Sequence, residues 1–210
     1  MVNSGKAEVL IPRILCSIEN TENLNINKED LCSVNISWKN GVVSELKPLK
    51  IKNKKPKNIL FPRFVEAHSH VDKAFIWKQF PNLKSDYEGA LSVNLQEHKT
   101  RTTKKVIERA ENSLNLAIKN GYRAIRSHID TFQNQGNDLW IELFKLQKKY
   151  SSKLQLQLVA LSPLEFWDTK NGKELAKQFS THKGILGGVV VPPFNKKETK
   201  NLLSKMLILA

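Results

Sequence analysis

The chain has 210 residues, of which 40% are hydrophobic and four are tryptophan, so it can form a hydrophobic core and is not a disordered polypeptide. It contains no run of about 18 apolar residues, and its first residues lack the basic-then-apolar order of a signal peptide, so no membrane span or secretion is expected. Cys16 and Cys32 lack metal-type spacing. We interpret them as free thiols of a cytoplasmic protein, with a disulfide as the alternative.

The formal net charge is +14, which allows either a nucleic-acid partner or a solvated, lysine-rich surface. The basic residues are mostly lysine, are spread over the whole chain and are densest in residues 47–57. Aromatic residues are not interleaved with them, and no nucleic-acid-binding module is recognisable. We therefore expect a solvated surface and no nucleic-acid partner.

Residues 1–57 have the composition of a small β unit. Segments 7–15 and 32–49 are rich in strand-forming residues, whereas the Asn-rich segment 19–30 is predicted to be a loop. Asn40 and Gly41 lie between two strand-like runs, which is typical of a tight hairpin. This unit is too thin to bury a core alone, and a first domain of residues 1–57 followed by a second of 58–210 is predicted.

The segment 58–75 organises the rest of the chain. Its apolar residues predict one strand that is covered on both faces; they are Ile59, Leu60, Phe61, Phe64 and Val65. His68 and His70 follow, and side chains two apart on a strand point to the same face. Two convergent imidazoles suit one metal ion, and Asp72 adds an acidic group nearby. The alternative is two histidines in a polar loop.

Beyond residue 75, helical and strand patterns alternate. After a long polar connection with Trp77, Phe80 and Tyr87, helices are predicted at 102–120, 136–150, 171–182 and 198–209, and strands at 122–130, 154–161 and 184–191. This order predicts βαβ units and a parallel sheet, and right-handed crossovers would curl four such units into half a barrel. His98, in the connection, and His182, at the end of a helix, are expected to be exposed.

The second predicted strand of this alternation, residues 122–130, also ends in polar residues. His128 and Asp130 lie near its carboxyl end, as His68 and His70 do on the first strand. Taken alone, His128 is read as a hydrogen-bonded interior histidine, because buried polar groups normally find partners.

The run FPRFVEAHSHVDKAF, residues 61–75, resembles the first barrel strand of the amidohydrolase superfamily, most closely its cytosine deaminase-like branch. The resemblance implies that His68 and His70 are ligands of a divalent metal, Zn or Fe. Arg126, His128 and Asp130 match the family's second strand, so His128 and Asp130, with Asp72, are expected on the substrate side or behind the metal ligands. The resemblance implies an α/β fold: a partial (β/α)8 TIM-like barrel of about four βα units, preceded by a small β-sandwich portion.

By resemblance, the function is that of a metal-dependent deaminase. Such an enzyme hydrolyses a C–N bond of a small cyclic amidine or pyrimidine-like ring and releases ammonia. Leu164 stands after Pro163 where cytosine deaminases carry a substrate-reading Gln, so the ring itself is left open. The family's remaining metal-ligand His, its general acid/base Glu and its last-strand Asp have no candidates here, and no catalytic residue is therefore named.

Whether the chain is itself an enzyme is consequently left open. A barrel has eight strands, and the sequence predicts four. We expect weak metal binding and no turnover by this chain alone. A complementing carboxyl-terminal half would complete the site, and self-association of half-barrels is a weaker alternative. The third alternative is a non-catalytic basic remnant or binding protein.

Overall fold

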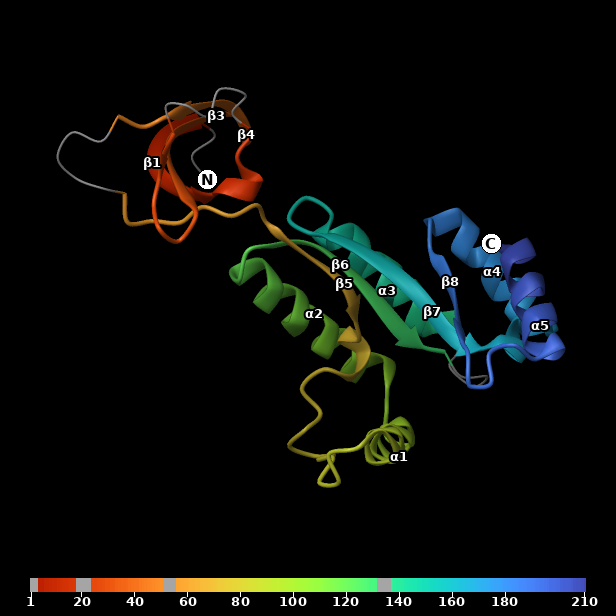
Figure 1. Ribbon diagram of the computed structural model, residues 1–210. Helices are drawn as coiled ribbons and strands as arrows, with labels where there is room; N and C mark the ends of the chain where they lie inside the picture. Colours follow the sequence, from red (N-terminus) through yellow and green to blue (C-terminus); the bar gives the residue numbers. More distant parts are fainter. Residues whose placement is uncertain (1–3, 18–23, 51–55, 132–136) are drawn as a thin grey trace. The chain divides into compact units, whose positions relative to one another are not determined.

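The computed structural model describes residues 4–17, 24–50, 56–131 and 137–210, drawn in colour in Figure 1. The chain divides into two compact units, Met1–Pro62 and Arg63–Ala210. Within the described ranges, no helix combines the length and the apolar character that a membrane crossing requires.

The first unit is an antiparallel sheet. Its strands are β1 (Ser4–Pro12), β2 (Asn25–Ile26), β3 (Leu31–Lys39) and β4 (Val42–Pro48). Strand β3 is central, with β1 along one side and β2 and β4 along the other. The two-residue strand β2 interrupts the predicted loop 19–30, because residue 25 pairs with residue 33; residues 19–23 of that loop lie outside the described ranges.

The predicted hairpin is confirmed. Lys39 pairs with Val42, and the two residues between them have positive φ, 54° at Asn40 and 75° at Gly41. A turn with positive φ at both central positions matches the twist of the flanking strands, and Asn-Gly accommodates it with little strain. Cys16 and Cys32 are both free thiols, as expected, and Cys32 is fully buried in the core of this unit.

The second unit contains a parallel sheet with helices, so the predicted mixed α/β class is confirmed. The strands, in spatial order, are β5 (Phe64–Ser69), β6 (Tyr122–Asp130), β7 (Gln155–Pro163) and β8 (Ile185–Val189). The helices that alternate with them are α2 (Thr103–Lys119), α3 (Asn137–Tyr150), α4 (Lys170–His182) and α5 (Lys197–Leu209). Each of these lies within two residues of its predicted position, and α2 packs on β6, α3 on β7, and α4 and α5 on β8 (Figure 1).

Helix α2 shows why the helical pattern was readable. The Thr102 side chain accepts a hydrogen bond from the Lys105 backbone N–H and so caps the helix. Val106, Ala110 and Leu114 recur at helical spacing and are fully buried in the core. The amphipathic stripe therefore fixes both the helix and the face that it packs.

One helix was not predicted. Helix α1 (Tyr87–His98) lies in the connection expected to be a polar loop, beyond the carboxyl end of β5 in Figure 1. Asp86 caps it by accepting from the Gly89 N–H at 2.6 Å. The helix has no buried apolar stripe: Leu91 and Leu95 are 45% and 47% exposed, and its buried long side chain is the charged Glu97. His98, at its last position, is partly buried, so its expected exposure is wrong, whereas His182 is exposed as expected.

The predicted burial of the first strand is wrong. Strand β5 begins at Phe64, after Pro62, and Phe64 and Val65 are 51% and 65% exposed. Among the described residues β5 is an edge strand, paired only with β6, so one side and much of one face stay open. Residues 59–61 belong to the first unit, where Ile59 bridges Leu10.

Candidate metal and heterocycle site

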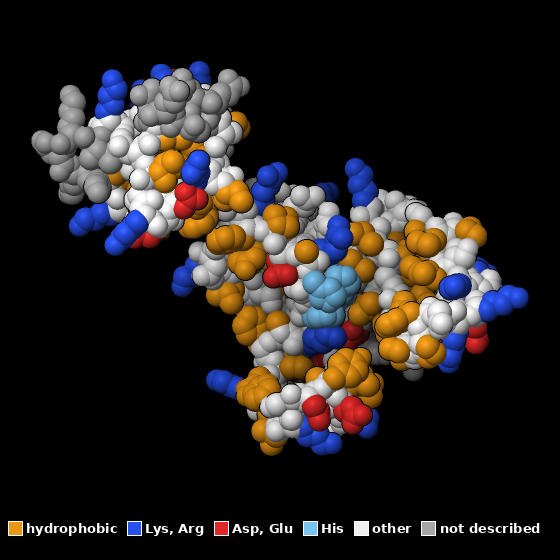
Figure 2. All heavy atoms as spheres, viewed as in Figure 1, with side chains coloured by type: hydrophobic (Ala, Val, Ile, Leu, Met, Phe, Trp, Pro, Cys, Tyr) orange, Lys and Arg blue, Asp and Glu red, His pale blue; other side chains and the backbone are white. Residues whose placement is uncertain are grey.

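Three imidazoles meet at the carboxyl ends of β5 and β6. His68 belongs to β5, His70 follows that strand directly, and His128 comes from β6. The ring centroids of His68 and His128 are 4.0 Å apart and stacked, and His70 lies 5.2 Å from His68 and 5.8 Å from His128. In Figure 2 the imidazoles form one patch on the second unit, bordered by hydrophobic side chains.

The end of β5 is held in place by its neighbour. The regular pairing of β5 with β6 breaks between Glu66 and Ser69, around the position of His68. Such irregularities bend a strand and re-aim its side chains, and they are common beside functional sites. Just beyond, the Val71 N–H donates to the buried Ser127 hydroxyl at 3.0 Å. The backbone that carries His68 and His70 is thus tied to β6.

The hydrogen bond of His70 fixes its tautomer. His70 Nδ1 lies 2.8 Å from the backbone carbonyl oxygen of His128. A carbonyl can only accept, so Nδ1 carries the proton and Nε2 keeps its lone pair. A histidine that donates Nδ1–H to a backbone carbonyl is the usual arrangement of a metal-ligating imidazole.

The residues present fit part of a metal site. His68 and His70 offer two nitrogen ligands on adjacent side chains, whereas a catalytic metal normally takes three protein ligands. Across the described parts of the chain, no group of three or more His, Cys, Asp or Glu side chains could hold a metal ion. His128 stacks on His68 instead of completing such a group, and its Nδ1 is buried without a hydrogen-bond partner in the described residues.

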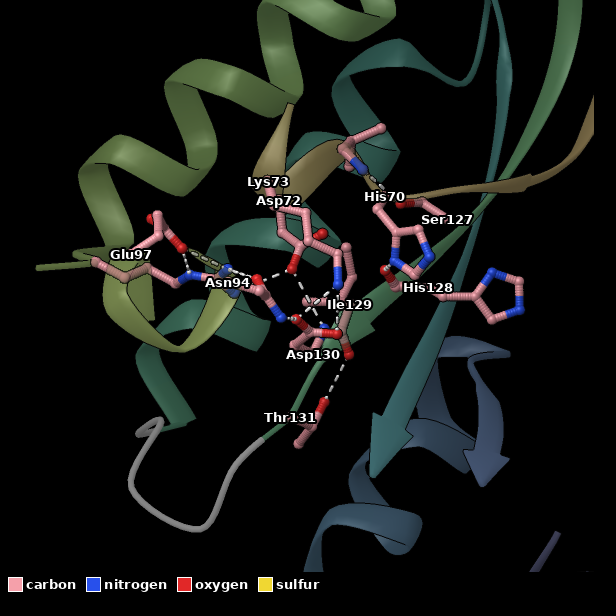
Figure 3. Close-up of polar contacts among 12 residues, drawn as sticks. His70, Asp72, Lys73, Asn94, Glu97, Ser127, His128, Ile129, Asp130 and Thr131 are labelled. Atoms are coloured by element: carbon pink, nitrogen blue, oxygen red, sulfur yellow. Dashed lines mark hydrogen bonds and ion pairs between the residues drawn. The ribbon is translucent and has the colours of Figure 1, made fainter. Parts of the chain in front are cut away.

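Asp130, the last residue of β6, is a polar hub beside His70 (Figure 3). Lys73 Nζ donates to both of its carboxylate oxygens, at 2.9 and 2.7 Å, and Asn94 from α1 donates to one of them at 2.8 Å. Burial alone would raise the pKa of Asp130, but the Lys73 ammonium and these hydrogen bonds outweigh it and hold the pKa below its ordinary value.

A buried ion-pair network lies behind this hub. Arg101 donates to Asp72 at 3.0 Å and to Glu97 at 2.6–2.7 Å, and Arg109 donates to Glu97 at 2.6 Å. The Asp72 and Glu97 side chains are 0% exposed and that of Arg101 is 3% exposed. The network joins the turn after β5 to the end of α1 and the start of α2, and Asp72 also accepts from the Asp130 N–H.

The pKa values of the two buried carboxyl groups, Asp72 and Glu97, are shifted in opposite directions. Burial, followed by the nearby Asp130 charge, raises the pKa of Asp72 to about 6, although Arg101 opposes the shift. Burial also opposes ionisation of Glu97, but the bonds from Arg101 and Arg109 outweigh it and lower its pKa. Glu97 is therefore the anionic centre that holds the two guanidinium groups.

Burial lowers the pKa of His70, His98 and His128 below 6.5. The fold thus favours the neutral imidazoles, and each contributes stability that is present above pH 6.5 and lost as the pH falls through its folded-state pKa. Asp72 acts in the other direction, because its raised pKa contributes stability below pH 3.8 that is lost as the pH rises through about 6.

A titration followed by NMR checks this environment. The ring resonances of His70 are expected to titrate with a midpoint below 6.5, because burial and the Lys73 charge disfavour the imidazolium. Replacing Lys73 with Met should move that midpoint upward. A midpoint at or above 6.5 in the unmodified chain would contradict the described burial of the ring.

A groove of about 850 Å³ opens at this end of the sheet. Its polar lining includes His70, Lys73, Asn94, Asp130 and Glu165, which come from the β5, β6 and β7 ends and from α1. Its apolar lining includes Phe75, Trp77, Phe80, Tyr87 and Val191. An apolar groove with a few convergent polar groups is typical of a small-molecule site, and aromatic walls suit a flat ring.

The predicted site residues are only partly brought together. His68, His70 and His128 form the imidazole cluster, and Asp130 lines the groove with His70. The Asp72 side chain points into the buried network. Sequence reasoning missed Lys73, Asn94, Glu97 and Arg101. The four-residue spacing of Glu97 and Arg101 was the available signal for a helix end in this connection.

The parallel sheet thus carries His68 and His70 at the carboxyl end of β5, and His128 and Asp130 at the carboxyl end of β6. No protein-family model matches the chain. The chain is 31% identical over 133 residues to a pterin deaminase of Rhizobium rhizogenes (strain K84 / ATCC BAA-868). The aligned residues make up 62% of this chain and 30% of that protein.

Solved structures show the same fold. The 5-methylcytosine deaminase of Klebsiella pneumoniae liganded with phosphonocytosine has a TM-score of 0.70 and 16% identity, covering 98% of this chain and 48% of that one. The N-isopropylammelide isopropylaminohydrolase of Burkholderia multivorans ATCC 17616 has a TM-score of 0.64 and 15% identity, covering 97% and 50%. The guanine deaminase of C. acetobutylicum has a TM-score of 0.54 and 15% identity, covering 98% and 51%.

These comparisons confirm the resemblance to the amidohydrolase superfamily and its cytosine deaminase-like branch. The chain spans about half the length of these solved chains and 30% of the pterin deaminase. The fold follows from the structures. The activity, substrate and metal of a whole deaminase do not follow from them.

Proposed function

We propose that the chain is the amino-terminal half of a metal-dependent deaminase that releases ammonia from a small cyclic nitrogen heterocycle. Residues 1–57 would supply part of a β-sandwich, and residues 58–210 would supply the first half of a (β/α)8 barrel. The observation that carries the proposal is the His68–His70 pair at the carboxyl end of a parallel strand, with His70 Nε2 left free by its bond to the His128 carbonyl. In barrels of this class, active sites lie at that end of the strands.

The metal, Zn or Fe, would be held by His68 and His70. When bound, such an ion would supply an activated water for the hydrolysis of a C–N bond at a ring carbon that bears an amino group. The residues of this chain would bind and orient the ring: His128 stacks against His68, and Asp130 holds the Lys73 ammonium beside His70. Asp72 would hold the turn that carries these groups, through Arg101.

The substrate would be a flat, amino-substituted ring. The aromatic groove accepts such a shape, and the similar proteins are named for pterin, 5-methylcytosine and guanine. Leu164, which follows Pro163, is buried, and its apolar side chain offers no polar group to the ring. Glu165 lines the groove and is the carboxylate of this segment that could contact it.

A complementing half would complete both the barrel and the metal site. Apolar side chains are exposed at both edges of the sheet: Phe64 and Val65 on β5, Val189 to Val191 at β8, and Leu207 and Ile208 on α5. Beside β5 lies a groove of about 650 Å³ lined by Phe64, Phe75, Leu116 and Tyr122, where a further strand and helix would pack. About half of each similar solved chain has no counterpart in this chain. A polypeptide of that length could supply the further strand and helix.

Metal binding by the chain alone tests the ligand assignment. Zn²⁺ is expected to bind weakly, because two protein ligands are fewer than the three of a catalytic site. The variant His68→Asn/His70→Asn should lose that binding in isothermal titration calorimetry. His182→Asn, which changes an exposed histidine at the end of α4, is the matched control. Equal affinity in the double variant and the unmodified chain would remove the proposed site.

A further inference from the structure

A second groove lies at the opposite end of the parallel sheet. It has a volume of about 1020 Å³ and is formed where β6 and β7 begin and where α3 and α4 end. Its cationic lining consists of Arg63, Arg123, Lys145, Lys148, Lys153 and Lys183, and His182 also lines it. No Asp or Glu is among the described residues that line it. The groove beside His70, by contrast, has Lys73 as its one Lys or Arg and contains Asp130 and Glu165.

Most of these cations are not neutralised by the chain. Within the described residues, Lys145 has a carboxylate partner, Glu142 at 2.7 Å, and no ion pair is formed by Arg123, Lys148, Lys153 or Lys183. Like charges gathered around one concavity repel one another and focus a positive potential in it. An anion in the groove would relieve that repulsion.

Three features give the groove a defined shape. The Arg63 guanidinium donates to the Tyr122 carbonyl and, at 3.2 Å, to the Lys153 carbonyl, so it is anchored between the β6 and β7 starts. On the far wall, the His182 ring stacks on Phe144 with centroids 4.1 Å apart. Gln147 donates to the Leu156 carbonyl at 2.7 Å, and this bond joins two lining residues of α3 and β7. The cations therefore surround a formed cavity and are not merely scattered over a convex surface.

We propose that this groove binds an anion made of linked phosphate groups, such as inorganic polyphosphate or the phosphate chain of a nucleotide. The cavity is much larger than one phosphate, and its cations come from four separate segments, so a chain of phosphates could contact several of them together. Arg and Lys are the side chains that proteins use for phosphate, and a polyanion gains from releasing counterions along its length. The site is independent of the proposed deaminase chemistry at the other end of the sheet.

Binding of tripolyphosphate to the full chain tests this proposal. At low salt, calorimetry should detect binding that the variant Lys148→Glu/Lys153→Glu weakens at least tenfold. The control Lys104→Glu/Lys200→Glu makes the same charge change at exposed positions of α2 and α5 and should leave the affinity within about twofold. Circular dichroism and thermal unfolding of each variant would verify that it is folded.

The source of the phosphates is separated by competing ligands. Equal binding of tripolyphosphate and ATP would indicate a polyphosphate site, and a preference for ATP would indicate that the Phe144–His182 wall stacks on the base; both support the groove. Absence of tripolyphosphate binding, or an equal loss in the groove and control variants, would overturn the proposal. Binding of a single-stranded oligonucleotide without tripolyphosphate would also overturn it, in favour of a diffuse nucleic-acid surface.

Discussion

Replacing Arg101 with Met is expected to destabilise the second unit by about 3–5 kcal/mol, the usual consequence of removing one partner from a buried ion pair. The side chain is 3% exposed and is bonded to both Asp72 and Glu97. Without it, two carboxyl groups stay buried, and among the described residues Glu97 keeps its ion pair with Arg109 alone. The end of α1 also loses the ion pairs through which Arg101 links it to Asp72, in the turn after β5.

Denaturant unfolding followed by tryptophan fluorescence measures this effect, because Trp140 and Trp167 are buried in the core of the same unit. Lys145→Met is the control: it removes an exposed pair with Glu142, and surface pairs are worth about 0–1 kcal/mol. A loss of the same small size in both variants would mean that the network does not hold the site together.

The second large effect concerns the proposed metal ligands in a completed enzyme. A chimera of this chain with the remainder of the R. rhizogenes pterin deaminase would test it. In an active chimera, His70→Ala should reduce kcat/KM for pterin deamination by more than about 100-fold, since even outer partners of metal ligands contribute about 10–100-fold. The bound-metal content should fall with it.

His182→Ala is the matched control in the chimera and should retain activity, because His182 lies at the other end of the sheet among the residues of the basic groove. Activity that survives His70→Ala with its metal content unchanged would show that other residues hold the ion. The variant Lys73→Met separates binding from metal retention: it should raise KM while the metal stays bound.

The alternating pattern after residue 101 was predictable because helices such as α2 and α4 carry an apolar stripe and the strands β6 and β7 carry buried apolar residues. The residues Val106, Ala110 and Leu114 on α2 illustrate this, as all three are fully buried. The His-x-His motif was equally readable, since its spacing and its place after a strand are local properties of the sequence. These features depend on residues that are close in the sequence or that recur at a regular spacing.

The missed features depend on polar contacts between distant segments. Helix α1 carries no apolar stripe and is fixed by Asn94 and Glu97, whose partners lie in other parts of the chain. The expected burial of Phe64 and Val65 presumed neighbours on both sides of the strand, and the described sheet supplies only β6. The charge of +14 predicted a dispersed basic surface, and composition could not locate the cations that line one groove.

Ammonia release is the most direct measurement of the central proposal, that this chain carries one half of a deaminase site. The purified chain and the chimera would be assayed with pterin, cytosine and guanine, with added Zn²⁺ or Fe²⁺ and with a chelator. The account predicts no release by the chain alone and chelator-sensitive release by the chimera. Chelator-sensitive release by the chain alone would contradict it, because a complete site would then exist within these 210 residues.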